Sequence, residues 1–263
     1  MVSAALPGEG RGGEPFICLD DLHKRFGEKV VLDGFSLDVL PGETLVILGG
    51  SGTGKSVALR HIIGLMRPDR GQVLVDGQRV DGLSEDELVS VRRKVGFLFQ
   101  GGALFDSMNV FDNIAFPLRE AGWNPEAVTE RVPEVLGLVD LEPEVAELMP
   151  DSLSGGMQKR VALARAIAVR PRGILYDEPT TGLDPVTANT INDLIRSMQE
   201  RLDVTSIVVT HDIQSAFRIG DRIAFLYHGR NHFLGSVQQV RECSDPVLCA
   251  FIAGRSLEDA ADA

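Results

Sequence analysis

The segment Gly49–Ser56 (GGSGTGKS) has the residue types and spacing of a phosphate-binding loop. It fits the pattern G-x-x-x-x-G-K-[ST], follows the apolar run Thr44–Leu48, and opens the stretch Lys55–Met66, which has helical periodicity. Glycines allow backbone N–H groups to turn toward phosphate oxygens, and the amino end of a helix favours negative charge. Lys55 would then reach the β- and γ-phosphates of a nucleotide, and the hydroxyl of Ser56 would ligate Mg²⁺.

A second group of candidate residues stands at the end of the apolar segment Ile174–Tyr176, where Asp177 and Glu178 follow directly. Open α/β sheets bind their ligands at the carboxyl ends of the strands. Asp177 would hold Mg²⁺ through water, and Glu178 would orient or deprotonate an attacking water. Two solvated acids at a strand end are the alternative for this pair alone. Together with the phosphate-binding loop, the pair favours phosphoryl chemistry.

Expected strands and helices, which must position these residues, alternate along the chain. Further apolar runs predict strands, and periodic or capped stretches predict helices. The expected strands are Phe16–Leu19, Val30–Leu32, Thr44–Leu48, Gln72–Gly77, Val95–Phe99, Ile174–Tyr176, Ser206–Val209 and Ile223–Leu226. The expected helices are Lys55–Met66, the Ser84-capped stretch to Lys94, and Pro185–Leu202, with a mostly helical block from Val110 to Val169 broken at Gly122, Pro133 and Gly137. This alternation predicts an α/β fold with a mainly parallel sheet.

Composition limits the classes of function. The 263 residues include 26 Lys or Arg and 38 Asp or Glu, for a net charge of −12. This acidity argues against non-specific binding to nucleic acid, which is a polyanion. The three cysteines form no CxxC pair and fit a reducing compartment. Without a signal peptide or a run of about 18 apolar residues, we expect a cytoplasmic chain that reaches a membrane only through a partner.

The segment Leu153–Arg160 (LSGGMQKR) resembles the signature motif of the ABC ATPases. Other motifs of that family stand around it in the family's order: Gln100 after a strand, Gly182–Asp184 after the acidic pair, and Thr210–Asp212 after a strand. The resemblance runs from about Phe16 to Gly235. It implies a P-loop NTPase with a RecA-like core, an antiparallel β subdomain and an inserted helical subdomain, binding ATP and Mg²⁺.

Roles follow from the resemblance residue by residue. Phe26 takes the place of the aromatic ring that stacks on adenine, where the family more often has Tyr. Gln100 resembles the lid-loop glutamine that touches Mg²⁺, and His211 resembles the switch histidine at the γ-phosphate. The catalytic set is Glu178, His211, Gln100 and Lys55, and the metal set is Ser56, Gln100 and Asp177. The nucleotide set on the same chain is Phe26, Gly49, Gly50, Ser51, Gly52, Thr53, Gly54, Lys55, Ser56 and Val57.

The resemblance also implies a homodimer. In the family, the residues corresponding to Ser154, Gly155 and Gly156 bind the ATP held by the opposite subunit, and Asp184 helps to connect the two sites. The implied domain organisation is a flexible N-terminus at 1–15, an ABC ATPase domain at 16–254 and a loose acidic tail at 255–263. Within the domain, the core is 16–100 and 161–235, the helical subdomain is 101–160 and a C-terminal helix covers 236–254.

The segments Leu98–Ser107 (LFQGGALFDS) and Val110–Glu120 (VFDNIAFPLRE) resemble the Mla/Mce-type ATPases of bacterial lipid transport. This branch implies permease subunits docking near Gln100–Phe116, with an Mce-domain lipid-binding protein and a small regulatory subunit as candidate partners, on the inner face of the cell membrane. The ATPase of an amino-acid or other small-solute importer is the alternative within the family. A nucleic-acid-linked ABC ATPase is the remote alternative, and we expect no nucleic-acid partner.

Overall fold

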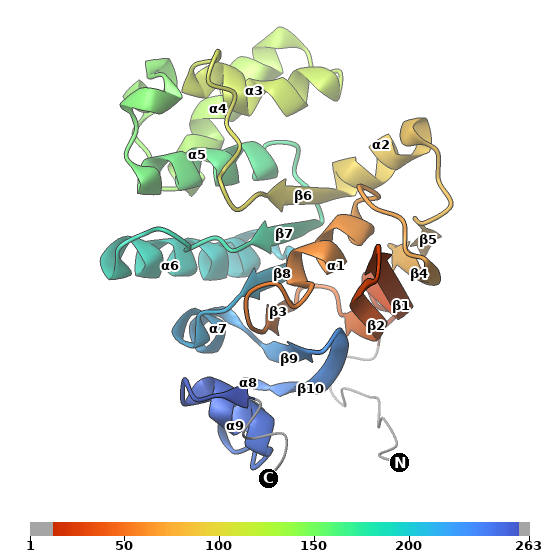
Figure 1. Ribbon diagram of the computed structural model, residues 1–263. Coiled ribbons are helices and arrows are strands. Elements are labelled where there is room, and N and C mark those ends of the chain that lie inside the picture. Colours follow the sequence, from red (N-terminus) through yellow and green to blue (C-terminus); the bar gives the residue numbers. More distant parts are fainter. Residues whose placement is uncertain (1–12, 258–263) are drawn as a thin grey trace.

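The computed structural model describes residues 13–257, so most of the expected loose ends, 1–15 and 255–263, lies outside the described range. Its centre is a six-stranded sheet in the order β10-β9-β3-β8-β7-β6 (Figure 1). Neighbouring strands are parallel except for the β9–β10 hairpin at one edge. The strands are β3 (Thr44–Leu48), β6 (Val95–Leu98), β7 (Gly173–Asp177), β8 (Thr205–Thr210), β9 (Arg222–Tyr227) and β10 (Arg230–Ser236). The prediction of a mainly parallel α/β sheet is confirmed.

A second sheet is antiparallel and has the order β2-β1-β4-β5. Its strands are β1 (Ile17–Phe26), β2 (Lys29–Val39), β4 (Arg70–Val75) and β5 (Gln78–Arg79). The first two are much longer than the short segments expected from the sequence. Register shifts occur after Leu19 and again after Leu22, so the alternation of buried and exposed residues that marks a strand is interrupted there.

The six-stranded sheet is buried on both faces. Along β3, Val46 and Leu48 pack in one hydrophobic core with the helices of the upper and left parts of Figure 1, whereas Leu45 and Ile47 pack in a second core with the antiparallel sheet. All five residues of this strand are buried. An uninterrupted apolar run is therefore what the position of β3 requires.

The helices pack on this framework. They are α1 (Lys55–Ile62), α2 (Glu85–Lys94), α3 (Val110–Glu120), α4 (Pro125–Leu138), α5 (Gly155–Ile167), α6 (Pro185–Leu202), α7 (Ile213–Ile219), α8 (Val237–Arg241) and α9 (Pro246–Ile252), with 3₁₀ turns at Pro143–Glu147 and Pro150–Ser152. The capping box expected before α2 is present, since the Ser84 N–H donates to Glu87 Oε2 at 2.8 Å. Among the helices of residues 13–257, none is sufficiently long and apolar to cross a membrane.

Two helix ends differ from the prediction. Helix α1 stops at Ile62 rather than Met66, because Gly64 adopts a left-handed φ of +66° that ends the helical path. Helix α4 runs through Pro133 and Gly137, which were expected to break it. Its residues Val132, Val135 and Leu136 are fully buried, so packing of this face outweighs the weak helix propensity.

Two expected segment boundaries also need correction. The single C-terminal helix expected at 236–254 is two helices, α8 and α9. The second begins anew because Asp245 caps it, accepting from the Leu248 N–H at 2.8 Å, and Pro246 occupies its first turn. The boundary expected at residue 160 falls inside α5, which continues without interruption from Gly155 to Ile167.

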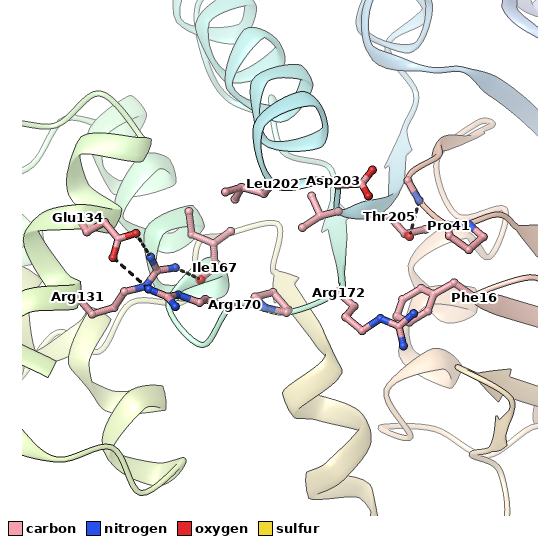
Figure 2. Close-up of a pocket in the computed structure, with 13 residues that line it drawn as sticks. Phe16, Pro41, Arg131, Glu134, Ile167, Arg170, Arg172, Leu202, Asp203 and Thr205 are labelled. Carbon is pink, nitrogen blue, oxygen red and sulfur yellow. Dashed lines mark hydrogen bonds and ion pairs between the residues drawn. The ribbon is translucent and has the colours of Figure 1, made fainter. Parts of the chain in front are cut away.

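A cavity of about 480 Å³ lies at the amino ends of the parallel strands, on the side away from the phosphate-binding loop (Figure 2). Arg131 of α4 lies in its wall with only 4 % of its surface exposed. Its Nε donates to the carbonyl of Ala168 at 3.0 Å and its Nη2 to that of Ile167 at 3.1 Å, while Nη1 pairs with Glu134 at 2.6 Å. This arginine therefore satisfies the carbonyls at the end of α5 and ties α4 to that helix.

We expect Arg131→Met to lower the free energy of unfolding by about 2–4 kcal/mol, because two buried carbonyls lose their donors. Chemical denaturation monitored by circular dichroism measures the loss. The control is Arg170→Met in the same cavity, whose side chain is 65 % exposed and should move the midpoint little. Equal midpoints for the two variants would contradict the structural role of Arg131.

Candidate functional site

Lys55 is the buried cation of the site. It opens α1 directly after the glycine-rich loop, and 5 % of its surface is exposed. Its Nζ donates to the carbonyls of Gly49 at 2.9 Å and Gly50 at 2.8 Å, and lies 3.5 Å from Oε1 of Glu178. Burial lowers the pKa of Lys55, and the carboxylate of Glu178 opposes that effect. The loop thus holds an ammonium group where phosphate oxygens would meet it.

The loop backbone requires its glycines. Gly52 and Gly54 have φ values of +75° and +106°, a region that side-chain-bearing residues rarely adopt. A Cβ on Gly54 would lie 2.9 Å from the carbonyl oxygen of Val31, and one on Gly49 would lie 2.6 Å from that of Leu226. The neighbouring backbones therefore leave no space for side chains. The result is a tight turn that suits close approach of a phosphate chain.

Asp177, the last residue of β7, meets Ser56 of α1. The Ser56 hydroxyl donates to Asp177 Oδ1 at 2.6 Å. Burial raises the pKa of Asp177, whereas this hydrogen bond lowers it. A hydroxyl and a carboxylate side by side are the hard oxygen donors that Mg²⁺ takes, with phosphate oxygens and water completing its shell. No group of three or more His, Cys, Asp or Glu side chains within residues 13–257 could hold a metal ion alone.

Glu178 is held in a strained conformation directly after β7. Its φ is +50°, unusual for a residue with a side chain, and its N–H donates to the carbonyl of Val209 at 2.9 Å. The carboxylate contacts His211 Nδ1 at 2.9 Å and accepts from Thr181 Oγ1 at 3.1 Å, beside Lys55. The turn therefore sends Asp177 and Glu178 in different directions, as their proposed separate roles require.

A cavity of about 410 Å³ collects most of the predicted nucleotide residues. Of the predicted residues, its lining includes Phe26, Ser51, Gly52, Gly54, Lys55, Ser56, Val57, Gln100 and Glu178. Gly49, Gly50 and Thr53 do not line it. They belong to the turn of the loop itself, where Thr53 Oγ1 donates to the Gly50 carbonyl at 2.9 Å. The lining also includes Lys29 and Val31, which sequence reasoning missed. Both belong to β2, which forms a hairpin with the strand that carries Phe26.

The signature residues do not line this cavity. Ser154 caps α5, accepting from the Met157 N–H at 3.3 Å, and both it and Gly155 are exposed. Asp184 caps α6, accepting from the N–H groups of Val186 and Thr187 at 3.0 and 3.1 Å. The structure therefore separates Ser154, Gly155, Gly156 and Asp184 from the nucleotide cavity of their own chain.

Gln100 follows β6, and its exposed side chain reaches the cavity. Its backbone carbonyl accepts a hydrogen bond from Lys159 of α5, a buried lysine whose pKa is lowered by burial. Arg165, further along the same helix, donates to the carbonyls of Gly102 at 2.9 Å and Ala103 at 2.8 Å. Sequence reasoning missed both cations. Their helical spacing on α5 was visible, but the loop they hold lies about 60 residues away in the chain.

Comparison with known proteins agrees with this geometry. The model of the family described as ABC transporter matches residues 32–181. The chain is 40% identical to the intermembrane phospholipid transport system ATP-binding protein MlaF of Haemophilus influenzae, over 88% of this chain and 87% of that protein. It is also 40% identical to the probable ribonucleotide transport ATP-binding protein mkl of Mycobacterium leprae, over 97% of this chain and 74% of that protein.

Solved structures show the same fold. The dimeric ATP-binding cassette MJ0796, described in a post-hydrolysis state with ADP and Pi, superposes with a TM-score of 0.77 at 36% identity, covering 84% of this chain and 98% of that one. CbiO1 from Clostridium perfringens, described as part of an ABC transporter complex, gives a TM-score of 0.80 at 26% identity, covering 91% and 96%. The chain belongs to the ABC transporter family of ATP-binding proteins and has its ATPase fold.

We expect Glu178→Gln to retain ATP binding and to lose a factor of about 10²–10⁴ in the rate of hydrolysis. The amide keeps the shape of the side chain but cannot accept a proton at neutral pH. Fluorescent nucleotide titration measures binding, and phosphate release measures turnover.

The matched variant is Lys55→Ala, which removes the charge from the loop and should weaken binding itself. Near wild-type turnover in Glu178→Gln would show that another group activates the water. Equal loss of nucleotide affinity in the two variants would contradict the division of roles.

Proposed function

We propose that this chain is the ATP-hydrolysing subunit of a bacterial ABC transporter that moves phospholipids or other hydrophobic lipids. The observation that carries the hydrolytic part is the arrangement of Glu178. Its carboxylate lies within contact distance of both Lys55 and His211, beside the cavity formed by the glycine-rich loop. A carboxylate in that position can take a proton from water attacking the terminal phosphate.

In this proposal each residue has one task. Lys55 and the loop N–H groups neutralise and position the phosphate chain, and Phe26, which is 48% exposed at the edge of the cavity, offers its ring face to the base. Glu178 accepts the proton of the attacking water, and His211, hydrogen-bonded to that carboxylate, contacts the γ-phosphate. Ser56, Asp177 and Gln100 would hold Mg²⁺, which when bound would offset the phosphate charge.

We also propose that two copies assemble head to tail. The exposed amino end of α5, with Ser154, Gly155 and Gly156, has free N–H groups suited to a phosphate but is absent from its own chain's cavity. The solved relative MJ0796 is described as dimeric. In the dimer, Ser154 would face the nucleotide of the partner copy and Asp184 would lie between the two sites.

The Glu178→Gln variant, bound to ATP, should show twice the monomer mass in light scattering.

An apolar groove of about 510 Å³ supports docking of a permease. Phe99, Phe105 and Phe116 line it and are 36%, 41% and 37% exposed. The groove begins at the loop that carries Gln100, so a bound helix would contact the nucleotide-sensing loop. Exposed aromatic side chains gathered in one groove are typical of a protein interface. We therefore assign the permease contact to the segment Gln100–Phe116.

The transported substrate is assigned from the segments that form the proposed permease contact. Relatives at the same 40% identity carry two different substrate descriptions, phospholipid and ribonucleotide. We favour lipid because the segments Leu98–Ser107 and Val110–Glu120, which form the proposed permease contact, resemble the lipid-transport branch. An Mce-domain protein and a small regulatory subunit would then complete the system, and the chain would lie at the inner face of the membrane. No nucleic-acid partner is proposed.

We expect Phe105→Arg to abolish co-purification with the permease while ATP binding and thermal melting stay unchanged. Phe105 is 41% exposed and lies in the groove with its ring 5.0 Å from that of Phe116 and 5.5 Å from the guanidinium of Arg165, so we expect a charge there to meet the partner rather than the core. Leu202→Arg is the control, being 37% exposed and located at the opposite end of the sheet. Retained co-purification would remove Phe105 from the interface, and a collapsed melt would place it in the core.

A further inference from the structure

A chain of buried polar side chains joins α6 to α7 beside the proposed switch histidine. Asn192 of α6 and Ser215 of α7 are 2% and 3% exposed. The Asn192 Nδ2 donates to Ser215 Oγ at 2.8 Å, and Ser215 Oγ donates to Asp212 Oδ2 at 2.6 Å. These two hydrogen bonds thus connect the middle of α6 to the residue that caps α7.

The available donor hydrogens fix the direction of these hydrogen bonds. A serine hydroxyl has one hydrogen to donate, and a carboxylate at neutral pH can only accept. The short contact with Asp212 therefore uses the Ser215 hydrogen. Ser215 must accept from Asn192, so the Asn192 amide has to present its NH₂ group. The hydrogen bonds of this chain therefore run in one direction only, from Asn192 to Ser215 to Asp212. If the amide of Asn192 turned over, its hydrogen bond to Ser215 would be lost.

This hydrogen-bond chain ends at Asp212, which follows His211 directly and helps to set its position. Asp212 caps α7, accepting from the Gln214 N–H at 3.0 Å, and its own N–H donates to Thr210 Oγ1 at 3.0 Å. His211 lies between these two anchored residues and reaches Glu178 with Nδ1. The other end of this hydrogen-bond chain is in α6, which begins at Pro185 directly after the Gly182–Asp184 loop. A cavity of about 670 Å³ is lined by both the loop and His211.

Packing does not explain why an amide occupies position 192. Its Oδ1 is buried and has no hydrogen-bond partner. Leaving such an acceptor unpaired in a protein interior costs stability, and an apolar residue would avoid the cost. The hydrogen bond that the side chain of Asn192 does make comes from its NH₂ group. That group has one partner, Ser215, in the chain leading to the histidine.

We propose that Asn192 is a positioning residue that makes the placement of His211 depend on the position of α6. A shift of α6 transmitted from the Gly182–Asp184 loop moves Asn192, and with it Ser215, the Asp212 cap and the histidine. The inference rests on the proposed function, because it takes His211 as the γ-phosphate contact. It adds the means by which the helix after the inter-subunit loop reaches that contact.

The test compares steady-state ATP hydrolysis of Asn192→Ala, Asn192→Val and Ser215→Ala in the full-length chain. We expect each to lower kcat about ten-fold with KM for ATP within about two-fold, because the catalytic groups remain but are less well placed. Asn192→Val fills most of the side-chain volume, so agreement of the two Asn192 variants excludes a packing effect. The double variant Asn192→Ala/Ser215→Ala should fall no further than the single variants, since both break one chain.

The control is Gln199→Ala, which removes another buried amide of α6. Gln199 Nε2 donates to the Gly42 carbonyl at 2.8 Å, at the far end of that helix from His211, so its loss should lower the melting temperature but not kcat. Wild-type kcat in the Asn192 variants, an equal loss in Gln199→Ala, or additive losses in the double variant would overturn the proposal.

His211→Ala distinguishes a failure of the Asn192 proposal from a failure of the proposed function. If that variant loses turnover and the Asn192 variants do not, the positioning role of Asn192 is wrong while the proposed function stands. If His211→Ala keeps full turnover, the role that the proposed function gives to His211 is wrong and the proposal for Asn192 is overturned with it.

Discussion

A buried ammonium group sets the design of the nucleotide site. Removing the charge of Lys55 from water costs several kcal/mol unless nearby groups compensate. Two loop carbonyls and the carboxylate of Glu178 supply that compensation. This requirement explains why the loop needs glycines with left-handed backbones and why β7 must end beside β8, where the strained turn at Glu178 can face Lys55. A triphosphate is the natural partner for a cation held this way at the edge of a parallel sheet.

Helix α5 connects the separate functional regions. Its first residues form the exposed signature, Lys159 donates to the carbonyl of Gln100, and Arg165 donates to the carbonyls of Gly102 and Ala103 in the same loop while lying over the ring of Phe105. One helix thus contacts the proposed inter-subunit surface, the loop that carries Gln100 and the groove that we propose as the permease contact. The carbonyl end of the same helix is fixed by Arg131, far from the nucleotide. A movement of α5 would therefore displace the signature residues, the Gln100 loop and the groove at Phe105 together.

The sequence predicts those parts of the structure that depend on neighbours in the chain. The glycine-rich loop, the capping box at Ser84 and the uninterrupted apolar strand β3 are local features with a direct physical signature. The length of β1 was missed because its register shifts interrupt the alternation of buried and exposed residues. The persistence of α4 through Pro133 was missed because tertiary burial, not propensity, stabilises it. Contacts such as that of Lys159 with Gln100 join residues distant in sequence, and one sequence alone gives no signal for them.

We propose that Lys55, the glycine-rich loop and the Ser56–Asp177 pair form a site for a metal-bound triphosphate. Isothermal titration of the purified full-length chain with AMP, ADP and ATP, each with Mg²⁺ and with a chelator, tests it directly. We expect affinity to rise with the number of phosphates and chelation to weaken ATP binding, because the proposed metal ligands and Lys55 act on the β- and γ-phosphates. Equal affinity for AMP and ATP, unaffected by chelation, would contradict it.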